Sequence, residues 1–379
     1  MTTDAGQPAE GSNRTPALWP FYVGGFLGPF GGAMVNAIVP EIGAGVGTDE
    51  AGAATALTAY MIPFSVLMIA SGTLGARWGL TRTIRVAYGL YAAASVLCMV
   101  ASSLPVFLGG RALQGVANAF TTPLLVALIA TLVPPERLAR ALGAYASFQA
   151  AGQAFAPFIG GLAAEWTYKA AFGASALAAI ALAVLTRGTD GGERTPADWR
   201  ALRNWRLVRS AGTAFCNQFA SSAVMVLAAL VAADRFGLSA SARGLVVACF
   251  GLAGLFTGRY IGGLAERYGV VRVGAVALVL GGAAVAAVGI APWVAALVAL
   301  VAAAGVAGTA GRVLTNSMAV ASTPGNIGGA TSITMATQFV GTAIVPALLP
   351  LYAASPVAAC AVAGALSAVG ALVATARRA

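Results

Sequence analysis

The sequence predicts an all-α integral membrane protein whose twelve transmembrane helices form two pseudo-symmetric halves of six helices. Hydrophobic residues make up 59% of the 379 residues and charged residues only 9%, and the mean hydropathy is +0.84. Such a composition lies outside the range of soluble globular domains. Apolar stretches of about 20 residues, enough for one membrane-spanning helix, recur along the chain. A motif near residue 72 also returns near residue 262, which indicates two copies of one design.

The internal repeat rests on two separate motifs. The stretch from Gly72 to Arg82 returns from Gly262 to Arg272, 190 positions later, with Gly, Leu, Arg, Gly and Arg in the same places. Gln149-x-x-Gly152 followed by Pro157 returns as Gln338-x-x-Gly341 followed by Pro346, an offset of 189. In so apolar a chain a half-length repeat indicates a transporter, because rocking one repeat against the other around a site between them produces alternating access.

The apolar stretches define the expected elements in chain order. Candidate spans begin near residues 18, 51, 83, 104, 138, 165, 208, 241, 271, 292, 325 and 354. They predict a cytoplasmic N-terminal tail (1–17), an N-terminal six-helix half (18–186), a cytoplasmic linker (187–207) and a C-terminal six-helix half (208–379). Trp199 and Trp205 stand among arginines in the linker. They suggest a short helix lying in the membrane interface, with a disordered linker as the alternative.

The charge pattern predicts the orientation in the membrane. Alternate loops hold most of the arginines, and the opposite loops hold few positive charges alongside several acids. The positive-inside rule then places both termini in the cytoplasm, as an even number of spans also requires. The polar first residues lack the apolar core of a cleavable signal. Topology therefore explains the net charge of +10 better than nucleic-acid binding does. We expect a multi-pass protein of the plasma membrane.

The cysteines and the absence of histidine bound the chemistry. Cys98, Cys216, Cys249 and Cys360 fall in four different apolar stretches without metal-like spacing, and the chain has no histidine. Free cysteine behaves as a small buried hydrophobe. We therefore expect packing roles, and neither a metal nor another cofactor. A membrane-embedded acyl- or glycosyltransferase would need a base or a metal site, so we expect no enzyme. Nothing resembles a nucleotide-binding loop that would supply ATP drive.

The repeated loop motif resembles a motif of the major facilitator superfamily. Within that superfamily the resemblance is to the twelve-span drug:proton antiporter branch. That family's pattern is Gly-x-Leu-small-Asp-Arg-x-Gly-basic-basic, and it latches the cytoplasmic ends of the two halves. Ala76 stands where the family has Asp, whereas the second copy keeps an acid, so the latch is altered. A purely topogenic basic loop is the alternative. The resemblance implies a latch made of Gly72, Arg77, Gly79, Arg82, Gly262, Glu266, Arg267, Gly269 and Arg272.

Two further motifs carry the same resemblance. Arg111-Ala-Leu-Gln114-Gly115 is similar to the family's Arg-x-x-Gln-Gly in span four, where the arginine is implicated in proton coupling. Arg111 lies well inside the predicted span that begins near residue 104. An ionisable group inside a span suggests a functional site, although the side chain of Arg111 could instead snorkel to the outer surface. The span-five signature Gly-x-x-x-Gly-Pro-x-x-Gly-Gly is matched by Gly152, Ala156, Pro157, Gly160 and Gly161, with only Ala156 departing. It favours export over import.

The family's cavity is lined by spans one, four, seven and ten, which selects the candidate binding residues. Arg312 and Asn316 share one helical face. The alternative for each Asn or Gln is an interhelical hydrogen bond, and the alternative for Arg312 is an anchor at the cytoplasmic end of its helix. The candidates are Asn36, Arg111, Gln114, Asn118, Asn217, Gln218, Arg312 and Asn316, with Gln149, Gln153 and Gln338 contributing from the side.

The positions of the acids shape the functional expectation. No Asp or Glu lies deep in a predicted span, and Asn36 stands near where the family often has an acid. Export of cations usually requires a buried carboxylate. We therefore expect a neutral or anionic substrate, with Arg111 and Arg312 supplying positive potential. Glu41, beside span one, is the candidate proton carrier.

The leading hypothesis is a secondary-active exporter of small neutral or anionic amphipathic molecules, proton-linked or facilitative. An uptake symporter or uniporter for organic anions, and more remotely a non-transporting receptor or scaffold, remain as alternatives. We expect a small-molecule substrate, with protons and membrane lipid as further partners. A monomer should suffice, because a two-half fold builds its pathway within one chain.

Overall fold

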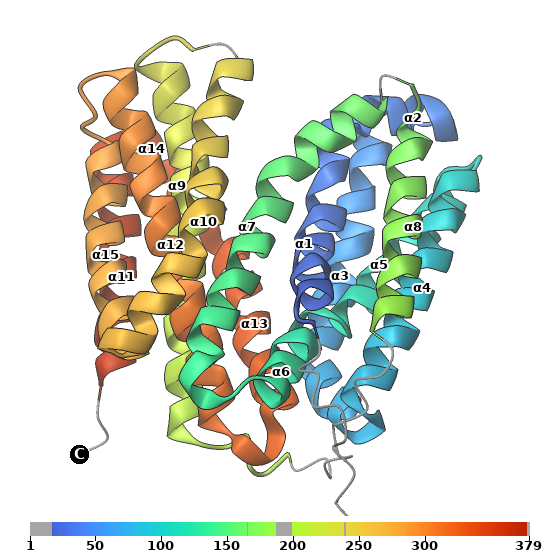
Figure 1. Cartoon of the computed structure of the whole chain (residues 1–379). Coiled ribbons are helices and arrows are strands. Elements are labelled where there is room, and N and C mark those ends of the chain that lie inside the picture. The colour runs from blue at the N-terminus through green and yellow to red at the C-terminus, as the bar shows by residue number, and fades with distance from the viewer. Residues whose placement is uncertain (1–16, 165, 187–198, 239, 377–379) are drawn as a thin grey trace, which may run out of the picture.

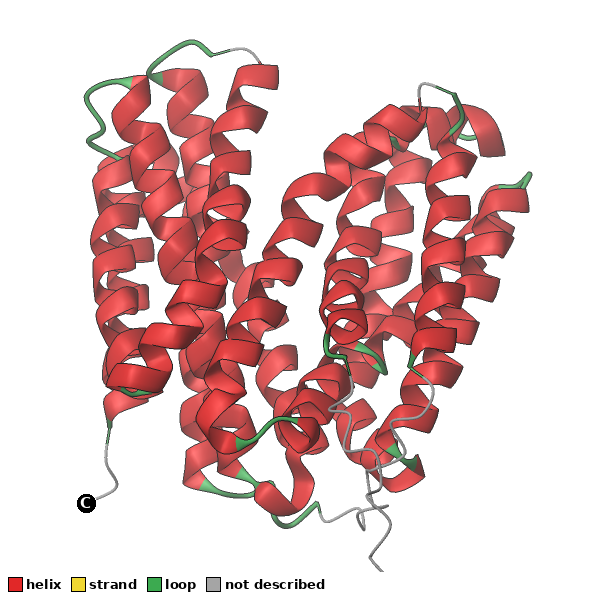
Figure 2. Ribbon diagram, in the orientation of Figure 1, coloured by secondary structure: helices red, strands yellow, loops and turns green. Residues whose placement is uncertain are grey.

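The computed structural model describes residues 17–164, 166–186, 199–238 and 240–376. Within these ranges the chain is built of helices joined by short loops, and no strand occurs (Figures 1 and 2). The predicted N-terminal tail lies, except for its last residue, outside the described part.

The helices fall on either side of the linker. Before it come α1 (Trp19–Ala33), the 3₁₀ turn η1 (Met34–Ala37), α2 (Val39–Val46), α3 (Glu50–Trp78), α4 (Leu80–Val100), α5 (Leu104–Ala119), α6 (Thr122–Leu132), α7 (Pro135–Ala164) and α8 (Tyr168–Leu185). After it come α9 (Trp205–Asp234), α10 (Ala240–Tyr268), α11 (Val270–Val288), α12 (Val294–Ser322), η2 (Pro324–Asn326), α13 (Ile327–Ile344), η3 (Val345–Leu348), α14 (Leu349–Ala354) and α15 (Pro356–Thr375).

The all-helical membrane fold predicted from the sequence is confirmed. Ten helical segments of the described chain are long and apolar enough to cross a bilayer, and each begins within a few residues of a predicted span. The two other predicted spans coincide with α1–α2 and with α7. The first is broken into short pieces, and α7 spans 30 residues but carries charged and polar side chains along its length.

Several of the predicted spans are interrupted. Pro29 lies inside α1, which gives way to η1 and α2. Pro123 opens α6, after the break at Phe120 and Thr121 that separates it from α5. Because proline lacks the N–H of a helical hydrogen bond, it favours such breaks. Broken helices in membranes are tolerated where they are buried in protein or line a cavity.

Both copies of the loop motif form the same turn. Gly79 ends α3 with φ 94° and ψ 124°, and Gly269 ends α10 with φ 91° and ψ 131°. This positive φ is strained for any residue with a Cβ atom. The glycine spacing that reveals the repeat in the sequence is therefore a backbone requirement of the turn.

Close helix crossings repeat at the same offsets. A Cβ on Gly152 would meet the carbonyl oxygen of Phe26, and one on Gly341 would meet that of Phe215. These contacts join α7 to α1 and α13 to α9. Without a hydrophobic driving force between helices in lipid, such backbone approach at small residues is what packs them. The second repeated motif thus marks a crossing that each half uses.

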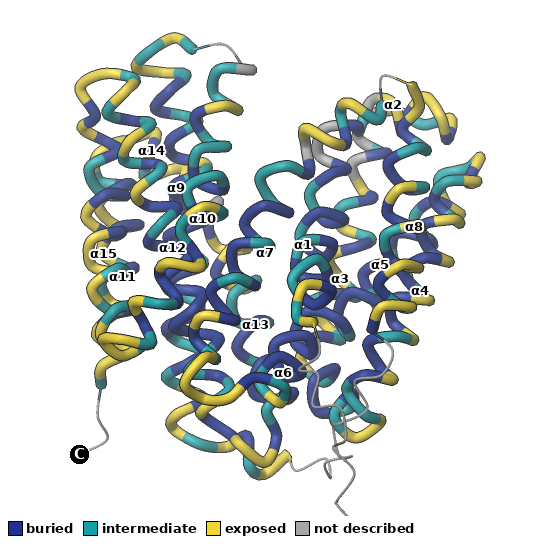
Figure 3. Tube along the Cα trace, viewed as in Figure 1, coloured by how far each residue is buried: buried dark blue, intermediate teal, exposed yellow. Residues whose placement is uncertain are grey.

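The two sets of helices meet mainly along two pairs, α7 with α10 and α3 with α13. Glycines again allow the approach: Gly262 faces Ala139 and Arg140, and Gly72 faces Gly328. In Figure 1 the two sets diverge toward the end that holds α2 and α14, away from α6. Figure 3 shows that the buried positions concentrate where the helices of each set face one another and where α7, α10 and α13 meet.

The short interfacial helix suggested for the linker is absent from its described residues. Trp199 to Asn204 form bends and turns, and residues 187–198 lie outside the described part. Trp205 is instead the first residue of α9, where the side chain of Asn204 accepts a hydrogen bond from the backbone N–H of Leu207. This cap fixes the helix start at Trp205, which the sequence predicts in the linker.

The crossing of α7 and α10 gives a direct test of this packing. A Cβ added at Gly262 would lie 2.6 Å from the Cα of Arg140 and 2.7 Å from the carbonyl oxygen of Ala139. We expect Gly262→Ala to lower the free energy of unfolding by about 1–3 kcal/mol, since backbone must shift. Gly244→Ala, on the same helix in open space, should be neutral or stabilising by up to about 1 kcal/mol. Thermal unfolding in nanodiscs compares the two, and equal stabilities would contradict the packing described.

Candidate functional site

A cavity of about 340 Å³ lies between the two sets of helices. Its walls come from α1, α3, α5, α6, α7, α9, α12 and α13. We call it the central cavity. It is lined by Gly28, Pro29, Gly32, Ala33, Leu57, Tyr60, Met61, Phe64, Asn118, Thr122, Gln149, Gln153, Gln218, Arg312, Met335, Gln338 and Phe339.

Among the residues that the structure describes, Arg312 is the single charged one in this lining. It lies in α12 and is only 6% exposed, so it is not an anchor at the helix end. Its Nη2 donates a hydrogen bond of 3.1 Å to the side-chain oxygen of Gln153 on α7. The remaining guanidinium donors have no hydrogen bond within the described residues. A positive charge in a poorly hydrated wall attracts an anion far more strongly than it would in water.

Four glutamines and one asparagine bring side-chain amides to the lining, beside the hydroxyls of Tyr60 and Thr122. Gln149 and Gln153 lie on α7, Gln338 on α13 and Gln218 on α9. The Nε2 of Gln218 donates to the hydroxyls of Ser222 and Thr342 at 3.2 and 3.3 Å. Amide groups both donate and accept hydrogen bonds without carrying charge. They can therefore orient polar groups of a ligand while Arg312 supplies the only charge.

Asn118 lines the cavity as part of a hydrogen-bonded set. Its amide nitrogen donates to the hydroxyl of Tyr60 at 2.6 Å, and its oxygen accepts from Thr121 and Thr122 at 2.9 and 3.1 Å. These contacts hold the junction between α5 and α6. Asn118 therefore both makes an interhelical hydrogen bond and lines the cavity.

Arg111 lies behind this wall and not in it. Its side chain is fully buried. It donates to the carbonyl oxygen of Gly31 at 3.1 Å and to the side chain of Gln114 at 2.6 Å. Its guanidinium carbon lies 4.5 Å from the ring centroid of Tyr60. Snorkelling to the surface is thus excluded, and Tyr60 stands between the charge and the cavity.

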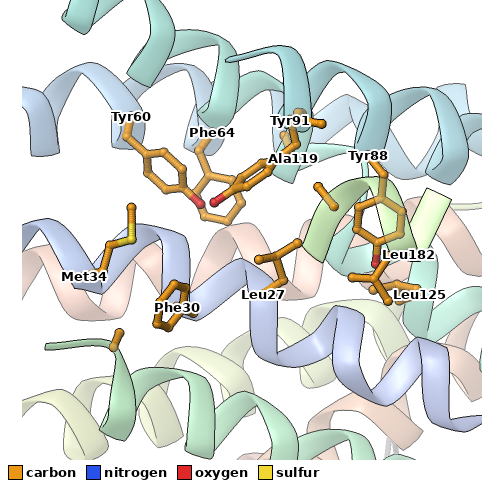
Figure 4. Close-up of a cluster of buried hydrophobic side chains, with 14 of the residues drawn as sticks. Leu27, Phe30, Met34, Tyr60, Phe64, Tyr88, Tyr91, Ala119, Leu125 and Leu182 are labelled. Atoms are coloured by element: carbon orange, nitrogen blue, oxygen red, sulfur yellow. The ribbon is translucent and has the colours of Figure 1, made fainter. Parts of the chain in front are cut away.

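The surroundings of Arg111 are aromatic and polar at once. Gln114 donates onward to the hydroxyl of Ser95 at 2.7 Å. Figure 4 shows Tyr60 and Tyr91 reaching from α3 and α4 toward Leu27 and Phe30 of α1 and Met34 of η1. The Nη2 of Arg111 and the hydroxyl of Tyr91 have no hydrogen-bond partner in the described structure. This cluster ties three helices of the first half to α1.

Other predicted residues lie away from the cavity. Asn217 is buried and donates to the carbonyl oxygen of Gly308 at 3.3 Å, which is an interhelical bond. Asn316 is also buried, one turn from Arg312. Glu41 is exposed in the first turn of α2. Asn36 lies in η1, and its side chain is outside the described part.

Aromatic side chains are the cavity residues that sequence reasoning missed. Tyr60 and Phe64 come from α3 and Phe339 from α13, and the rings of Phe64 and Phe339 meet edge to face with centroids 4.7 Å apart. Met61 and Met335 extend the same wall. In an apolar chain such residues are indistinguishable from lipid-facing ones. The only signal was Tyr60, a polar tip in the middle of an apolar span.

The span-five motif serves helix packing. Gly152 and Gly160 lie against the backbone of Phe26 and Met34, so α7 follows α1 and η1 closely. Ala156 is fully buried, whereas a Cβ on Gly161 would meet open space. The side chain of Pro157 lies outside the described part.

One end of the central cavity is closed by contacts between the two sets of helices. The hydroxyls of Ser71 and Ser332 lie 3.2 Å apart, and the amide of Asn326 donates to the hydroxyl of Thr73 at 3.1 Å. The hydroxyl of Thr331 donates to the carbonyl oxygen of Pro123 at 3.1 Å. These contacts surround the crossing of Gly72 with Gly328 on the loop-motif side.

The second copy of the loop motif adds an ion pair to this closed end. Arg140 on α7 and Glu266 on α10 lie 2.8 Å apart, and Glu266 also accepts from the backbone N–H of Arg140 at 2.9 Å. At the corresponding places of the first copy stand Ala76 and, by the offset of 189, Gly329. One closure is therefore charged and the other is formed by small residues. Arg77, Arg82, Arg267 and Arg272 are exposed.

The described residues contain no group of three His, Cys, Asp or Glu side chains that could hold a metal ion. Cys98, Cys216 and Cys360 are buried and Cys249 is half-buried, and all four are free thiols.

The sequence matches the Major Facilitator Superfamily over residues 21–212 and 210–378. The MFS-type transporter EfpA of Mycobacterium tuberculosis is 35% identical over 136 residues, which cover 35% of this chain and 26% of the relative. The drug efflux pump JefA of the same organism is 32% identical over 130 residues, covering 34% and 26%. The chain thus spans about a quarter of the length of the curated relatives it matches.

Solved structures share the fold at low sequence identity. The fucose:proton symporter FucP of E. coli superposes with a TM-score of 0.78 at 15% identity, covering 94% of this chain and 97% of that one. The human organic anion transporter MFSD10 gives 0.76 at 16% identity, covering 97% and 100%. With both repeats matched by the family model and the whole fold matched by solved structures, the chain belongs to the major facilitator superfamily.

Proposed function

We propose that this transporter is a secondary-active exporter of small organic molecules that works by alternating access and favours neutral or anionic amphipathic compounds. The observation that carries this proposal is Arg312, the single charge in the central cavity lining, with several of its donors open to a ligand. A cationic ligand would meet repulsion there, whereas an anionic group would complete the coordination of the guanidinium.

The size and the remaining walls of the cavity support an amphipathic ligand. A volume of about 340 Å³ lies in the usual range for small-molecule sites. Tyr60, Phe64 and Phe339 with two methionines offer an apolar surface in the same cavity as the amides. An organic anion would place its apolar body against these rings and its charged group at Arg312.

Export is favoured by the span-five signature and by the partial relatives, one of which is named a drug efflux pump. Uptake of an organic anion by symport or uniport would use the same cavity. The direction of substrate movement under an imposed proton gradient distinguishes these two functions.

The closed end supports a latch between the two halves. In the orientation that the positive-inside rule predicts, with both termini cytoplasmic in the plasma membrane, this end faces the cytoplasm. Gly72, Gly262 and the pair of Arg140 with Glu266 hold it shut, and the turns at Gly79 and Gly269 fix the loops. The pathway is built within one chain, so we expect a monomer to transport.

The anion preference is tested by ligand-induced thermal stabilisation of the purified protein. Organic anions should raise the melting temperature of the wild type, because a ligand that binds the folded state stabilises it. In Arg312→Gln this shift should vanish, while Arg235→Gln, an arginine outside the cavity, should keep it. If only cations stabilised the protein, and did so equally in both variants, the proposed preference for anions would be refuted.

The latch is tested by neutralising its acid. Glu266→Gln removes a partly exposed ion pair worth up to about 1 kcal/mol, so the ratio of closed to open molecules at this end should fall up to about fivefold. Glu136→Gln, an exposed acid at the start of α7, is the matched control. Distances between spin labels at the ends of α7 and α10 measure the change. An unchanged distance distribution would argue against a latch.

Proton coupling is proposed to use Glu41, with Arg111 as its second candidate. Glu41 is exposed beside the broken first span, where it can exchange protons with water. Glu41→Gln should abolish substrate movement driven by a pH gradient in proteoliposomes and leave substrate-induced stabilisation intact. If pH-driven transport persists in this variant, as it should in Glu136→Gln, Glu41 is not the carrier.

A further inference from the structure

A second hollow, of about 570 Å³, lies on the side of the molecule near the closed end. Its lining comes from α1, α6 and α7 of the first half and from α10 of the second. We call it the lateral groove. It combines three arginines, Arg137, Arg140 and Arg259, with apolar side chains that include Leu18, Tyr22 and Phe148.

The charges of the lateral groove are incompletely balanced by protein. Arg140 is paired with Glu266. The side chains of Arg137 and Arg259 are exposed and have no hydrogen bond or ion pair among the described residues. Three positive charges thus face one carboxylate. Arginine remains charged in proteins, so the groove keeps an excess positive charge at any physiological pH.

The position of Arg259 along α10 limits which kind of anion can pair with it. It lies nine residues before Tyr268, the last residue of α10, which is about 13 Å along the helix at 1.5 Å per residue. A charge this far from the helix end is costly next to hydrocarbon unless it is paired. A phosphate carried by a lipid can reach this level, because its acyl chains already occupy the surrounding bilayer.

The apolar side of the groove suits such chains. The rings of Tyr22 and Phe148 lie 5.9 Å apart between their centroids, and Leu132 and Val133 extend the surface. A soluble anion would leave this surface unused. A phospholipid satisfies both parts at once, with its phosphate at the arginines and a chain along the rings.

We propose that the lateral groove is a binding site for an anionic phospholipid, whose headgroup bridges Arg137 on α7 and Arg259 on α10. Because the two arginines belong to different halves, the site is complete only while α7 and α10 are packed together as they are here. The bound lipid therefore stabilises this arrangement. The inference is independent of the substrate proposed for the central cavity.

The test uses the full-length protein in nanodiscs of phosphatidylcholine with increasing phosphatidylglycerol. Phosphatidylglycerol should raise the melting temperature of the wild type in a saturable way. Arg259→Gln and Arg137→Gln should each weaken its apparent affinity about fivefold, since one arginine near a lipid surface contributes about that factor. Arg203→Gln, an exposed arginine outside the groove, is the matched control and should bind as the wild type does.

Two control experiments distinguish lipid binding in the lateral groove from binding in the central cavity and from binding of free phosphate. Arg312→Gln should retain the full lipid effect, which distinguishes the lateral groove from the central cavity. Inorganic phosphate, added to phosphatidylcholine nanodiscs, should give no comparable stabilisation. Equal phosphatidylglycerol effects in the wild type, Arg259→Gln and Arg137→Gln would overturn the proposal, as would an effect reproduced by inorganic phosphate. Melting of both variants in pure phosphatidylcholine establishes that they fold.

Discussion

Backbone-to-backbone approach of helices at glycines is the constraint on which the rest of this structure depends. In lipid no hydrophobic force draws helices together, so contact area must come from close packing. Gly115 and Gly305 lie against the carbonyl oxygens of Tyr60 and Phe250, an offset of 190 at both ends of the contact. Each half is thus assembled by the same crossings. The halves then meet at Gly72 and Gly262, which leaves the space between them that becomes the cavity.

The buried arginines Arg111 and Arg312 have different surroundings, and so they differ in whether a ligand can reach them. Arg111 has its guanidinium occupied by a carbonyl, an amide and an aromatic face, in a site sealed from the cavity by Tyr60. Arg312 makes one side-chain hydrogen bond and lines open space. The guanidinium of Arg111 is closed off from a ligand by Tyr60, whereas the guanidinium of Arg312 faces the cavity, where its free donors are within reach of a ligand. The same residue type is therefore enclosed within one half and exposed to the cavity in the other.

The closed end also shows how the repeats have diverged. One crossing carries the pair of Arg140 with Glu266, and the other has Ala76 and Gly329 at the corresponding places. The uncharged crossing is held by the hydrogen bond of Asn326 to Thr73 and by glycine contact.

The sequence by itself determined the membrane class, the two repeats and the start of ten spans to within a few residues, because hydropathy, span length and motif spacing are local properties. It also selected Arg312, Asn118, Gln218 and the glutamines of spans five and eleven. Only the tertiary structure decided that Arg111 and Asn217 lie behind the cavity wall and that Tyr60, Phe64 and Phe339 form its surface. Which face of a helix meets the cavity depends on how the helices cross and where they break. These features arise from pairs of helices, so the sequence of one helix does not determine them.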